Sequence, residues 1–319
     1  MRGTYISLRE TAGMWSFCYG DRMLTLDEKK IRKGKPLGLP YQGSKKKISK
    51  KIVEIIKQNF GTDKAIYDVF GGGGAITAEC LLNSLEVHYN DLDKEITDMF
   101  QRVISQDREW IKTLIVSREE FCEIKNKIDK TIDDNIKLLV NSFGNNKKSY
   151  LYNKEWSDTK HNLATEIINK YDIFSGYRRT EAYKQSVDSF RNKQLQQIEQ
   201  QGRLGRLQQL QQLQQIERLQ QLAQLEPTNL SYEAFSNVEG AIFYLDPPYE
   251  NTTHKGYEGK FDSQAFYDWA FEMSKKNIVL ISSYEISDYK FKCVFEFEKA
   301  RSTMQSGTAG KTEKLFMVV

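Results

Sequence analysis

The stretch from residue 65 to residue 104 constrains the fold more than any other part of the chain. AIYDVF reads as a buried strand, GGGG as a tight turn and AITAECLLN as a helix, and the strand LEVHYND and the helix KEITDMFQRVI follow directly. Strands that alternate with helices in this way build a parallel sheet covered by helices. The alternation returns near the C-terminus in GAIFYLD, NIVLISSY, VFEFEK and KLFMVV. We therefore predict an α/β fold with a doubly wound sheet.

The strand in GAIFYLD ends abruptly at Asp246-Pro247-Pro248-Tyr249. Neither proline can donate to a β-ladder, and each restricts the backbone around it, so the chain leaves the sheet in a rigid turn. The turn holds a carboxylate, a backbone carbonyl and an aromatic ring together. Open α/β sheets bind ligands at the carboxyl ends of their strands, which makes this turn a candidate site. A purely structural turn is the alternative.

The glycines of DVFGGGG also follow a strand, and they open a helix. Glycine lets the backbone turn tightly and approach a ligand, and the helix N-terminus offers free N–H groups to an anion. The next strand ends at Asp91, where nucleoside-binding folds hold ribose hydroxyls. The two features together predict a nucleoside cofactor. The spacing matches neither GxGxxG nor GxxxxGK[ST], which argues against NAD and ATP.

Charge and composition describe a soluble protein with a substantial core. The chain has 319 residues, of which 39% are hydrophobic and 28% charged, and its net charge is +4. Residues 29–51 carry many lysines and arginines and no acid. Such a run suits contact with a phosphate backbone, although a solvated surface is the alternative.

Scattered cysteines and histidines indicate neither a metal site nor a disulfide framework. No apolar run approaches the length of a membrane span, and the N-terminus lacks the apolar segment of a signal peptide. We therefore expect a cytoplasmic protein. Residues 1–22 lack clear periodicity and are expected to be a disordered extension.

A low-complexity tract rich in leucine and glutamine covers residues 194–226. From Leu204 to Leu225 every third residue is Leu or Ile. On an α-helix this repeat drifts by about 60° per step, so the side chains spiral around the helix instead of forming one seam. We predict a helical spacer that contributes little to core packing in a monomeric protein. A dimerising coiled coil is the alternative.

Several motifs, in their order along the chain, resemble those of the Dam-type (D12 class, alpha-group) DNA adenine-N6 methyltransferases. The resemblance covers Leu37 to Val319. LPYQGSKKKI resembles the amino-terminal cofactor motif, DVFGGGG the glycine motif, YNDLDKE the segment with the ribose-binding acid, and DPPY the catalytic tetrapeptide. Two departures are Ser44, where the family often has a second glycine, and the long spacer.

The resemblance implies a Rossmann-like methyltransferase sheet with an inserted, mainly helical target-recognition domain. Residues 23–105 would form the cofactor-binding half, residues 106–232 the target-recognition region, including the spacer, and residues 233–319 the catalytic half. The implied cofactor is S-adenosylmethionine, and no metal is implied. The implied partner is double-stranded DNA, with a GATC-like site as the first expectation.

Individual roles follow from the same resemblance. The catalytic residues would be Asp246, Pro247, Pro248 and Tyr249. The cofactor-binding residues would be Tyr41, Lys45, Asp68, Phe70, Gly72, Gly74, Asp91 and Asp246. The DNA-binding residues would be Lys46, Asn145, Tyr152, Asn153 and Lys154. For the pair of Tyr41 and Lys45, and for the DNA-binding positions in the middle of the chain, a plain surface loop is the alternative.

Chemistry supports this assignment. The lone pair of an adenine amino group is delocalised into the ring, which makes the nitrogen a poor nucleophile. If Asp246 and the carbonyl of Pro247 accept its two hydrogens, the nitrogen can pyramidalise toward a sulfonium methyl, helped by preorganised dipoles. Tyr249 would stack on an adenine swung out of the duplex. Competing interpretations are methylation of cytosine N4, an RNA base or a protein amide, and a non-catalytic DNA-binding or coiled-coil scaffold.

Overall fold

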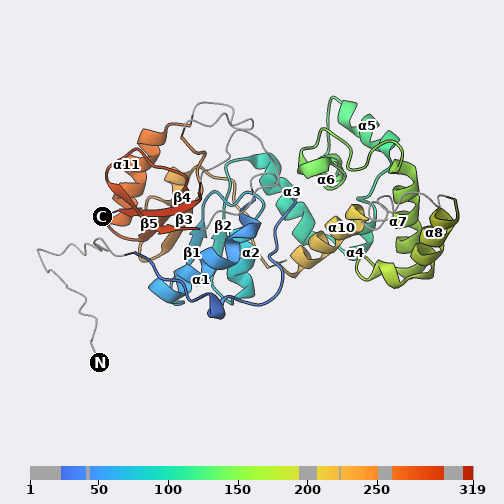
Figure 1. The fold of residues 1–319 in the computed structure, drawn as a ribbon. Coiled ribbons are helices and arrows are strands. Elements are labelled where there is room, and N and C mark those ends of the chain that lie inside the picture. The colour runs from blue at the N-terminus through green and yellow to red at the C-terminus, as the bar shows by residue number, and fades with distance from the viewer. Residues whose placement is uncertain are drawn as a thin grey trace, which may run out of the picture.

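A computed structural model describes residues 23–40, 44–193, 207–222, 224–250, 261–297 and 312–318. These residues form two lobes (Figure 1). The sheet lobe is built around a six-stranded sheet with the order β2-β1-β3-β4-β6-β5. The helical lobe is formed by the middle of the chain, from residue 106 to residue 222. Helices α3 and α10 lie between the two lobes in Figure 1.

The sheet is parallel over its first four strands and mixed at its far edge. The strands are β1 (Ile66–Asp68), β2 (Val87–Tyr89), β3 (Ile242–Leu245), β4 (Ile278–Ser283), β5 (Phe291–Glu296) and β6 (Lys314–Val318). β1 pairs in parallel with both β2 and β3, and β3 pairs in parallel with β4. β6 lies antiparallel between β4 and β5. The predicted strands are confirmed, and the expectation of a parallel sheet holds for β1 to β4.

Helices cover both faces of the sheet, because the central strands alternate their side chains between two apolar layers. Ile242 and Tyr244 face a cluster that includes residues of α1 (Ser49–Phe60) and α2 (Ala75–Leu82). Phe243 and Leu245 face a second cluster, which includes residues of α11 (Ser263–Ser274). All four residues of β3 are buried. A strand buried on both faces reads as a continuous apolar run, which explains why IFYL stands out in the sequence.

The helical lobe follows α3 (Lys94–Ser105). Its helices are α4 (Arg108–Lys112), α5 (Arg118–Asn126), α6 (Ile132–Val140), α7 (Ser157–Tyr171), α8 (Glu181–Lys193) and α10 (Gln208–Leu219). Short 3₁₀ helices are η1 (Glu28–Lys30), η2 (Lys45–Lys47), η3 (Phe143–Asn145), η4 (Tyr177–Arg179), η5 (Gln220–Leu222) and η6 (Tyr232–Phe235). Within the described ranges, no helix combines the length and the apolar character needed to cross a membrane.

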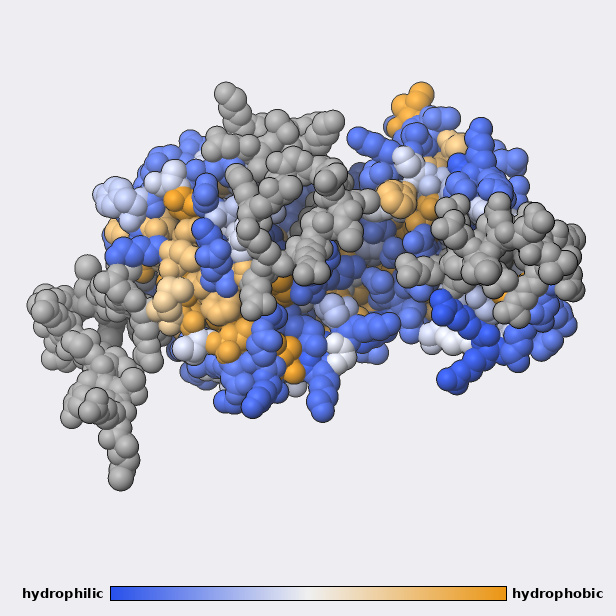
Figure 2. All heavy atoms as spheres, in the orientation of Figure 1, coloured by the Kyte–Doolittle hydropathy of each residue, from blue (hydrophilic) through white to orange (hydrophobic). Residues whose placement is uncertain are grey.

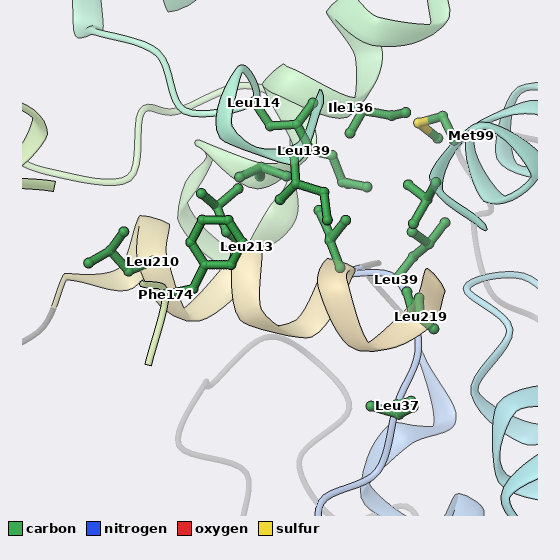
Figure 3. Close-up of a cluster of buried hydrophobic side chains, with 14 of the residues drawn as sticks. Leu37, Leu39, Met99, Leu114, Ile136, Leu139, Phe174, Leu210, Leu213 and Leu219 are labelled. Carbon is green, nitrogen blue, oxygen red and sulfur yellow. The ribbon is translucent and has the colours of Figure 1, made fainter. Parts of the chain in front are cut away.

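The leucine tract contradicts its prediction as a spacer outside the core. Its C-terminal part is helical, as expected, in α10 and η5. However, every third residue from Leu207 to Leu225 is buried, and the four such residues inside α10 are fully inaccessible. Figure 3 shows Leu210, Leu213 and Leu219 among side chains of the surrounding elements, with Leu114, Leu139 and Phe174 nearby. This part of the tract therefore belongs to the apolar core of the lobe. Residues 194–206 and residue 223 of the tract lie outside the described residues.

The error in the prediction has a geometric cause. A spiral of leucines is unsuited to a single seam, but it suits a helix that is surrounded by partners on several sides. From Leu210 to Leu219 the drift of about 60° per step turns the apolar face through about half of the helix circumference. Helix α10 contacts α3, α4, α6 and α7, so each part of the spiral finds an apolar neighbour. In the 3₁₀ turn that follows, a three-residue repeat stays on one face.

Replacing Leu213 by alanine tests this role. The side chain is fully buried, so Leu213→Ala should lower the free energy of unfolding by about 2 to 5 kcal/mol, through lost burial and the cavity left behind. Gln211→Ala, at an exposed position of the same helix, is the control and should cost less than about 1 kcal/mol. Denaturant unfolding measures both. Equal losses of stability for the two substitutions would contradict a core role for Leu213 and favour the prediction of a surface spacer.

Candidate active site

Three carboxylates come together at one edge of the sheet. Asp68 ends β1 and Asp246 follows β3, and Asp91 stands two residues after the end of β2. The three strands are adjacent and parallel, so their carboxyl ends lie side by side. The chain leaves β1 toward β2 on one side and later returns as β3 on the other. Such a reversal of strand order leaves a crevice in which open α/β sheets bind ligands.

The glycine turn between β1 and α2 is required by close packing. Gly72 and Gly74 have φ angles of +49° and +68°, in the left-handed region that favours glycine. A Cβ atom on Gly74 would lie 2.5 Å from the ring of Phe100, and one on Gly71 would lie 2.4 Å from the ring of Tyr89. The turn therefore lies directly on aromatic rings of the layer beneath it, and any side chain there would displace them.

Asp91 fastens this turn to the end of β2. Its Oδ2 accepts a hydrogen bond of 2.7 Å from the backbone N–H of Gly72, and its Oδ1 accepts one of 2.8 Å from the N–H of Asp93. Burial raises the pKa of Asp91 to about 6, although both backbone hydrogen bonds lower it. The carboxylate thus shapes the turn, and its remaining lone pairs are available to a ligand.

Asp68 is buried beneath the turn and holds the start of α2. Its Oδ2 accepts hydrogen bonds from the backbone N–H and the hydroxyl of Thr77, at 3.1 and 2.6 Å. Burial raises the pKa of Asp68 to about 7, since it disfavours the charged form more than the Thr77 donors favour it. This geometry gives Asp68 a structural role beneath the glycine turn.

Asp246 is the centre of a polar cluster. Lys45 Nζ lies 2.9 Å from Asp246 Oδ1 and 3.4 Å from Glu313 Oε1, and it also donates to the hydroxyl of Tyr249. That hydroxyl lies 3.1 Å from Asp246 Oδ1 and 2.6 Å from Glu313 Oε1. The prediction assigned Lys45 to the cofactor. The structure places its ammonium group against Asp246 and Tyr249, in the segment predicted to be catalytic.

Burial and charge act against each other in this cluster. Burial raises the pKa of Asp246, while the Lys45 ammonium lowers it and the Glu313 carboxylate raises it. Burial lowers the pKa of Lys45, but Asp246 and Glu313 outweigh that effect, so the net pKa is raised and the side chain stays protonated. Burial and the same two carboxylates raise the pKa of Tyr249. The cluster therefore contains the Lys45 cation, which is shared between Asp246 and Glu313. It also contains the neutral phenol of Tyr249.

Glu313 and Ser282 were missed by the sequence-based predictions. Ser282 is the penultimate residue of β4, and its hydroxyl donates a hydrogen bond of 2.7 Å to Glu313 Oε1. Glu313 immediately precedes β6, the strand beside β4. Local sequence contains no signal for this contact, because an acid before a strand is common. Only the pairing of β6 with β4 brings Glu313 to Asp246.

The remaining predicted residues are dispersed. Tyr41 lies outside the described residues. Phe70 is half-buried and its ring packs against Tyr232 and Phe266. Lys46 Nζ donates to Gly38 O and Gln215 Oε1. The described residues contain no cluster of three or more His, Cys, Asp or Glu side chains that could hold a metal ion.

The predicted DNA-binding residues of the middle region lie around a small hairpin, in which Ser142 pairs with Tyr150. Asn153 and Lys154 are exposed just beyond it. Tyr152 is buried, and its hydroxyl accepts a hydrogen bond from the backbone N–H of Gln209 in α10. This placement argues against a base contact by Tyr152. Asn145, with φ of +55°, donates through its side chain to Leu139 O, which gives it a local structural role.

A sheet that brings a glycine turn and a proline-fixed carboxylate to the same crevice is typical of α/β enzymes that use a nucleoside cofactor. Comparison with known families resolves the kind of enzyme. Residues 41–299 match the model of the D12 class N6 adenine-specific DNA methyltransferases, so the chain belongs to that family. It methylates adenine N6 in DNA, and methyltransferases of this kind use S-adenosylmethionine. The alternatives of cytosine, RNA or protein methylation and of a scaffold gain no support. No curated protein matches the chain.

Asp68 yields a test that depends on pH. Its pKa of about 7 in the folded protein lies above the ordinary value of 3.8, so the folded protein keeps a proton that the unfolded chain has lost. The free energy of unfolding therefore falls as the pH rises from about 4 to about 7. Asp68→Asn, whose side-chain oxygen can still accept from Thr77, removes this fall. The variant should gain stability over the wild type across that range, by on the order of 1.4 kcal/mol for each unit of pKa shift.

Denaturant unfolding of the cofactor-free protein at pH 4.5 and pH 8 measures this gain. Asp63→Asn, in an exposed turn, is the matched control and should follow the wild type at both pH values. If Asp68→Asn follows the wild type as well, Asp68 does not carry the buried titration inferred from its environment.

Proposed function

We propose that Asp246 and the carbonyl of Pro247 bind the N6 amino group of an adenine swung out of the duplex. One observation carries this proposal: Asp246 directly follows a buried strand beside the glycine turn, and Lys45 holds one of its oxygens, Oδ1, across 2.9 Å. Oδ2 of the same carboxylate is then oriented to accept a hydrogen from the amine. An adenine stacked inside DNA cannot present its amino group to a buried carboxylate, so the base must leave the helix.

The chemistry asked of the protein is mainly positioning. Two acceptors on one amine draw its hydrogens into defined directions and leave the lone pair pointing along a third. Rigid prolines fix both acceptors before the substrate arrives, so little reorganisation is needed during the reaction. The ring of Tyr249, which meets Tyr284 edge-on at 4.7 Å, would supply a flat surface for the adenine. When bound, S-adenosylmethionine supplies the electrophilic methyl group.

The glycine turn and its surroundings fit a nucleoside cofactor. We assign cofactor contacts to the backbone at Gly72 and Gly74, to the ring of Phe70 and to the carboxylate of Asp91, which would accept from the ribose hydroxyls. Asp68 would act from beneath by holding the turn. Both acids stand at strand ends on the same edge of the sheet as Asp246, so the methyl donor and the adenine would meet at this edge.

A basic pocket beside α10 is suited to the phosphate backbone of DNA. Its volume is about 740 Å³, and it lies between the segment before α1, the turn after α7 and the exposed face of α10. Hydrophilic residues cover most of the described surface of the helical lobe in the view of Figure 2. The cationic residues that line the pocket are Lys35, Lys46, Lys47, Arg178, Arg179 and Arg218. No acidic side chain among the described residues lines it.

The surroundings of Lys46 favour a negatively charged ligand in this pocket. Its two hydrogen-bond acceptors are neutral, and burial lowers its pKa to about 8. A negative group in the pocket would restore the charged form, which is the behaviour expected of a phosphate contact. Because Lys46 is the neighbour of Lys45, backbone held in this pocket would lie next to the catalytic cluster. We therefore propose that duplex DNA runs from the pocket across the catalytic edge of the sheet.

We propose that the target-recognition region, residues 106–232, selects the target sequence; the helical lobe forms most of it. The exposed Asn153 and Lys154 beyond the hairpin carry an amide and a cation of the kind that reads base edges and phosphates. The leucine tract would act indirectly, by forming the core on which this surface stands.

The chemistry is tested by Asp246→Asn. Asparagine keeps the size of the side chain and replaces one acceptor oxygen with a donor. Methyl transfer to DNA should fall at least about 10² to 10³-fold in single-turnover assays, as for the loss of one preorganised group at a reacting centre. Affinity for S-adenosylmethionine, measured by calorimetry, should change far less, because the ribose and glycine-turn contacts remain. A near-normal transfer rate would contradict the assignment of Asp246.

The basic pocket is tested by a double variant, Lys47→Gln with Arg179→Gln. Both side chains are exposed at the pocket. Their removal should weaken binding to all duplexes alike and reduce the slope of log affinity against log salt by about 2. The control is Lys275→Gln with Lys276→Gln, which removes the same charge at the exposed end of α11, far from α10 in Figure 1. Equal salt slopes for the two double variants would contradict the proposal that the pocket binds DNA.

A further inference from the structure

Glu313 is the most connected side chain of the catalytic cluster that the proposed mechanism does not use. One oxygen, Oε1, accepts hydrogen bonds from the Tyr249 hydroxyl at 2.6 Å and the Ser282 hydroxyl at 2.7 Å. The same oxygen lies 3.4 Å from Lys45 Nζ. Its side chain is 15% exposed, close to the 14% of Lys45 and the 17% of Asp246. A structural acid at the edge of a sheet needs no such set of partners.

The hydrogen bonds indicate that Glu313 positions both Tyr249 and Lys45. The Tyr249 hydroxyl has one proton, and its shorter contact is with Glu313. Lys45 donates to that hydroxyl and to Asp246. Glu313 thereby fixes the tyrosine ring and, through it and directly, the ammonium group. Both groups reach Asp246 on the same oxygen, Oδ1.

Charge sharing gives Glu313 a second effect. An ammonium between two carboxylates interacts with both, and in a poorly solvated site these interactions are strong. With Glu313 present, Lys45 is divided between Asp246 and Glu313. Without that negative charge, Lys45 would be held by Asp246 alone, and the carboxylate would become a weaker hydrogen-bond acceptor.

We propose that Glu313 is a positioning residue for methyl transfer, which shares the Lys45 ammonium with Asp246 and holds Tyr249 so that Asp246 keeps a strong acceptor oxygen for the adenine amine. This inference rests on the proposed function of Asp246. It assigns a part in the reaction to the residue just before β6, which lies beyond the family match that ends at residue 299.

Glu313→Gln separates charge from hydrogen bonding. The amide oxygen can still accept from Tyr249 and Ser282, so a purely structural role predicts little change. A charge-sharing role predicts a fall of about 10-fold in the single-turnover rate, smaller than for removal of Asp246 itself. It also predicts that the acid limb of the pH–rate profile moves to lower pH, because the undivided Lys45 charge stabilises ionised Asp246.

Several other groups influence Asp246, and the substitution leaves all of them in place. They are Lys45 from η2, Tyr249 and Tyr244 from the strand and turn of Asp246 itself, Asp68 and Asp91 from the neighbouring strand ends, and Tyr284 after β4. Any shift of the acid limb in the variant is therefore attributable to Glu313. Glu285→Gln, an exposed acid after β4, is the matched control and should keep the wild-type rate and profile.

A double-mutant cycle tests the route of the effect. If Glu313 acts through Lys45, Glu313→Gln should slow the wild type but have little further effect in a Lys45→Met background. Equal slowing in both backgrounds would overturn the proposal, and so would a wild-type rate for Glu313→Gln. A loss of melting temperature or of S-adenosylmethionine affinity in Glu313→Gln would overturn it too, by showing a general structural role. A wild-type protein that forms no N6-methyladenine in DNA would instead contradict the proposed function.

Discussion

The crowding of carboxylates at one edge of the sheet is the constraint on which the site depends. Parallel pairing of β1 with β2 and β3 places Asp68, Asp91 and Asp246 side by side, where like charge and burial both oppose ionisation. Each acid is compensated differently: Asp68 by the donors of Thr77, Asp91 by backbone N–H groups, and Asp246 by the Lys45 ammonium. Asp246 is thus the acid that is compensated by a side-chain cation, whereas Asp68 and Asp91 are compensated by neutral donors.

Under the proposed function, this difference divides the edge into a cofactor half and a catalytic half. In the cofactor half, backbone hydrogen bonds lock Asp91 and the glycine turn into one shape before any ligand arrives, and such preorganisation lowers the entropic cost of binding. In the catalytic half, Lys45, Tyr249 and Glu313 form a network whose members share protons and charge. A site that must grip an amine and then release a methylated product benefits from an acceptor whose strength its neighbours adjust.

The helical lobe connects to this edge through α3 and α10. Helix α3 begins just after Asp91, and α10 lies against both α3 and the segment that leads to Lys45 and Lys46. The apolar spiral of α10 therefore joins the core of the helical lobe to the side of the basic pocket. Through this packing, the surface that we propose contacts DNA would stay in register with Asp246.

The sequence by itself determined those parts of the molecule whose chemistry is local. The strand, glycine turn and helix around Asp68, and the buried strand that stops at Asp246 and its prolines, were predictable because every residue involved lies within one short segment. Tertiary structure alone decided which side chains from distant parts of the sequence surround Asp246. Lys45 and Tyr249 are 204 positions apart, and Glu313 joins them only because β6 pairs with β4. It also decided the role of the leucine tract, since a three-residue spiral specifies which side chains are apolar but not how many neighbours surround them.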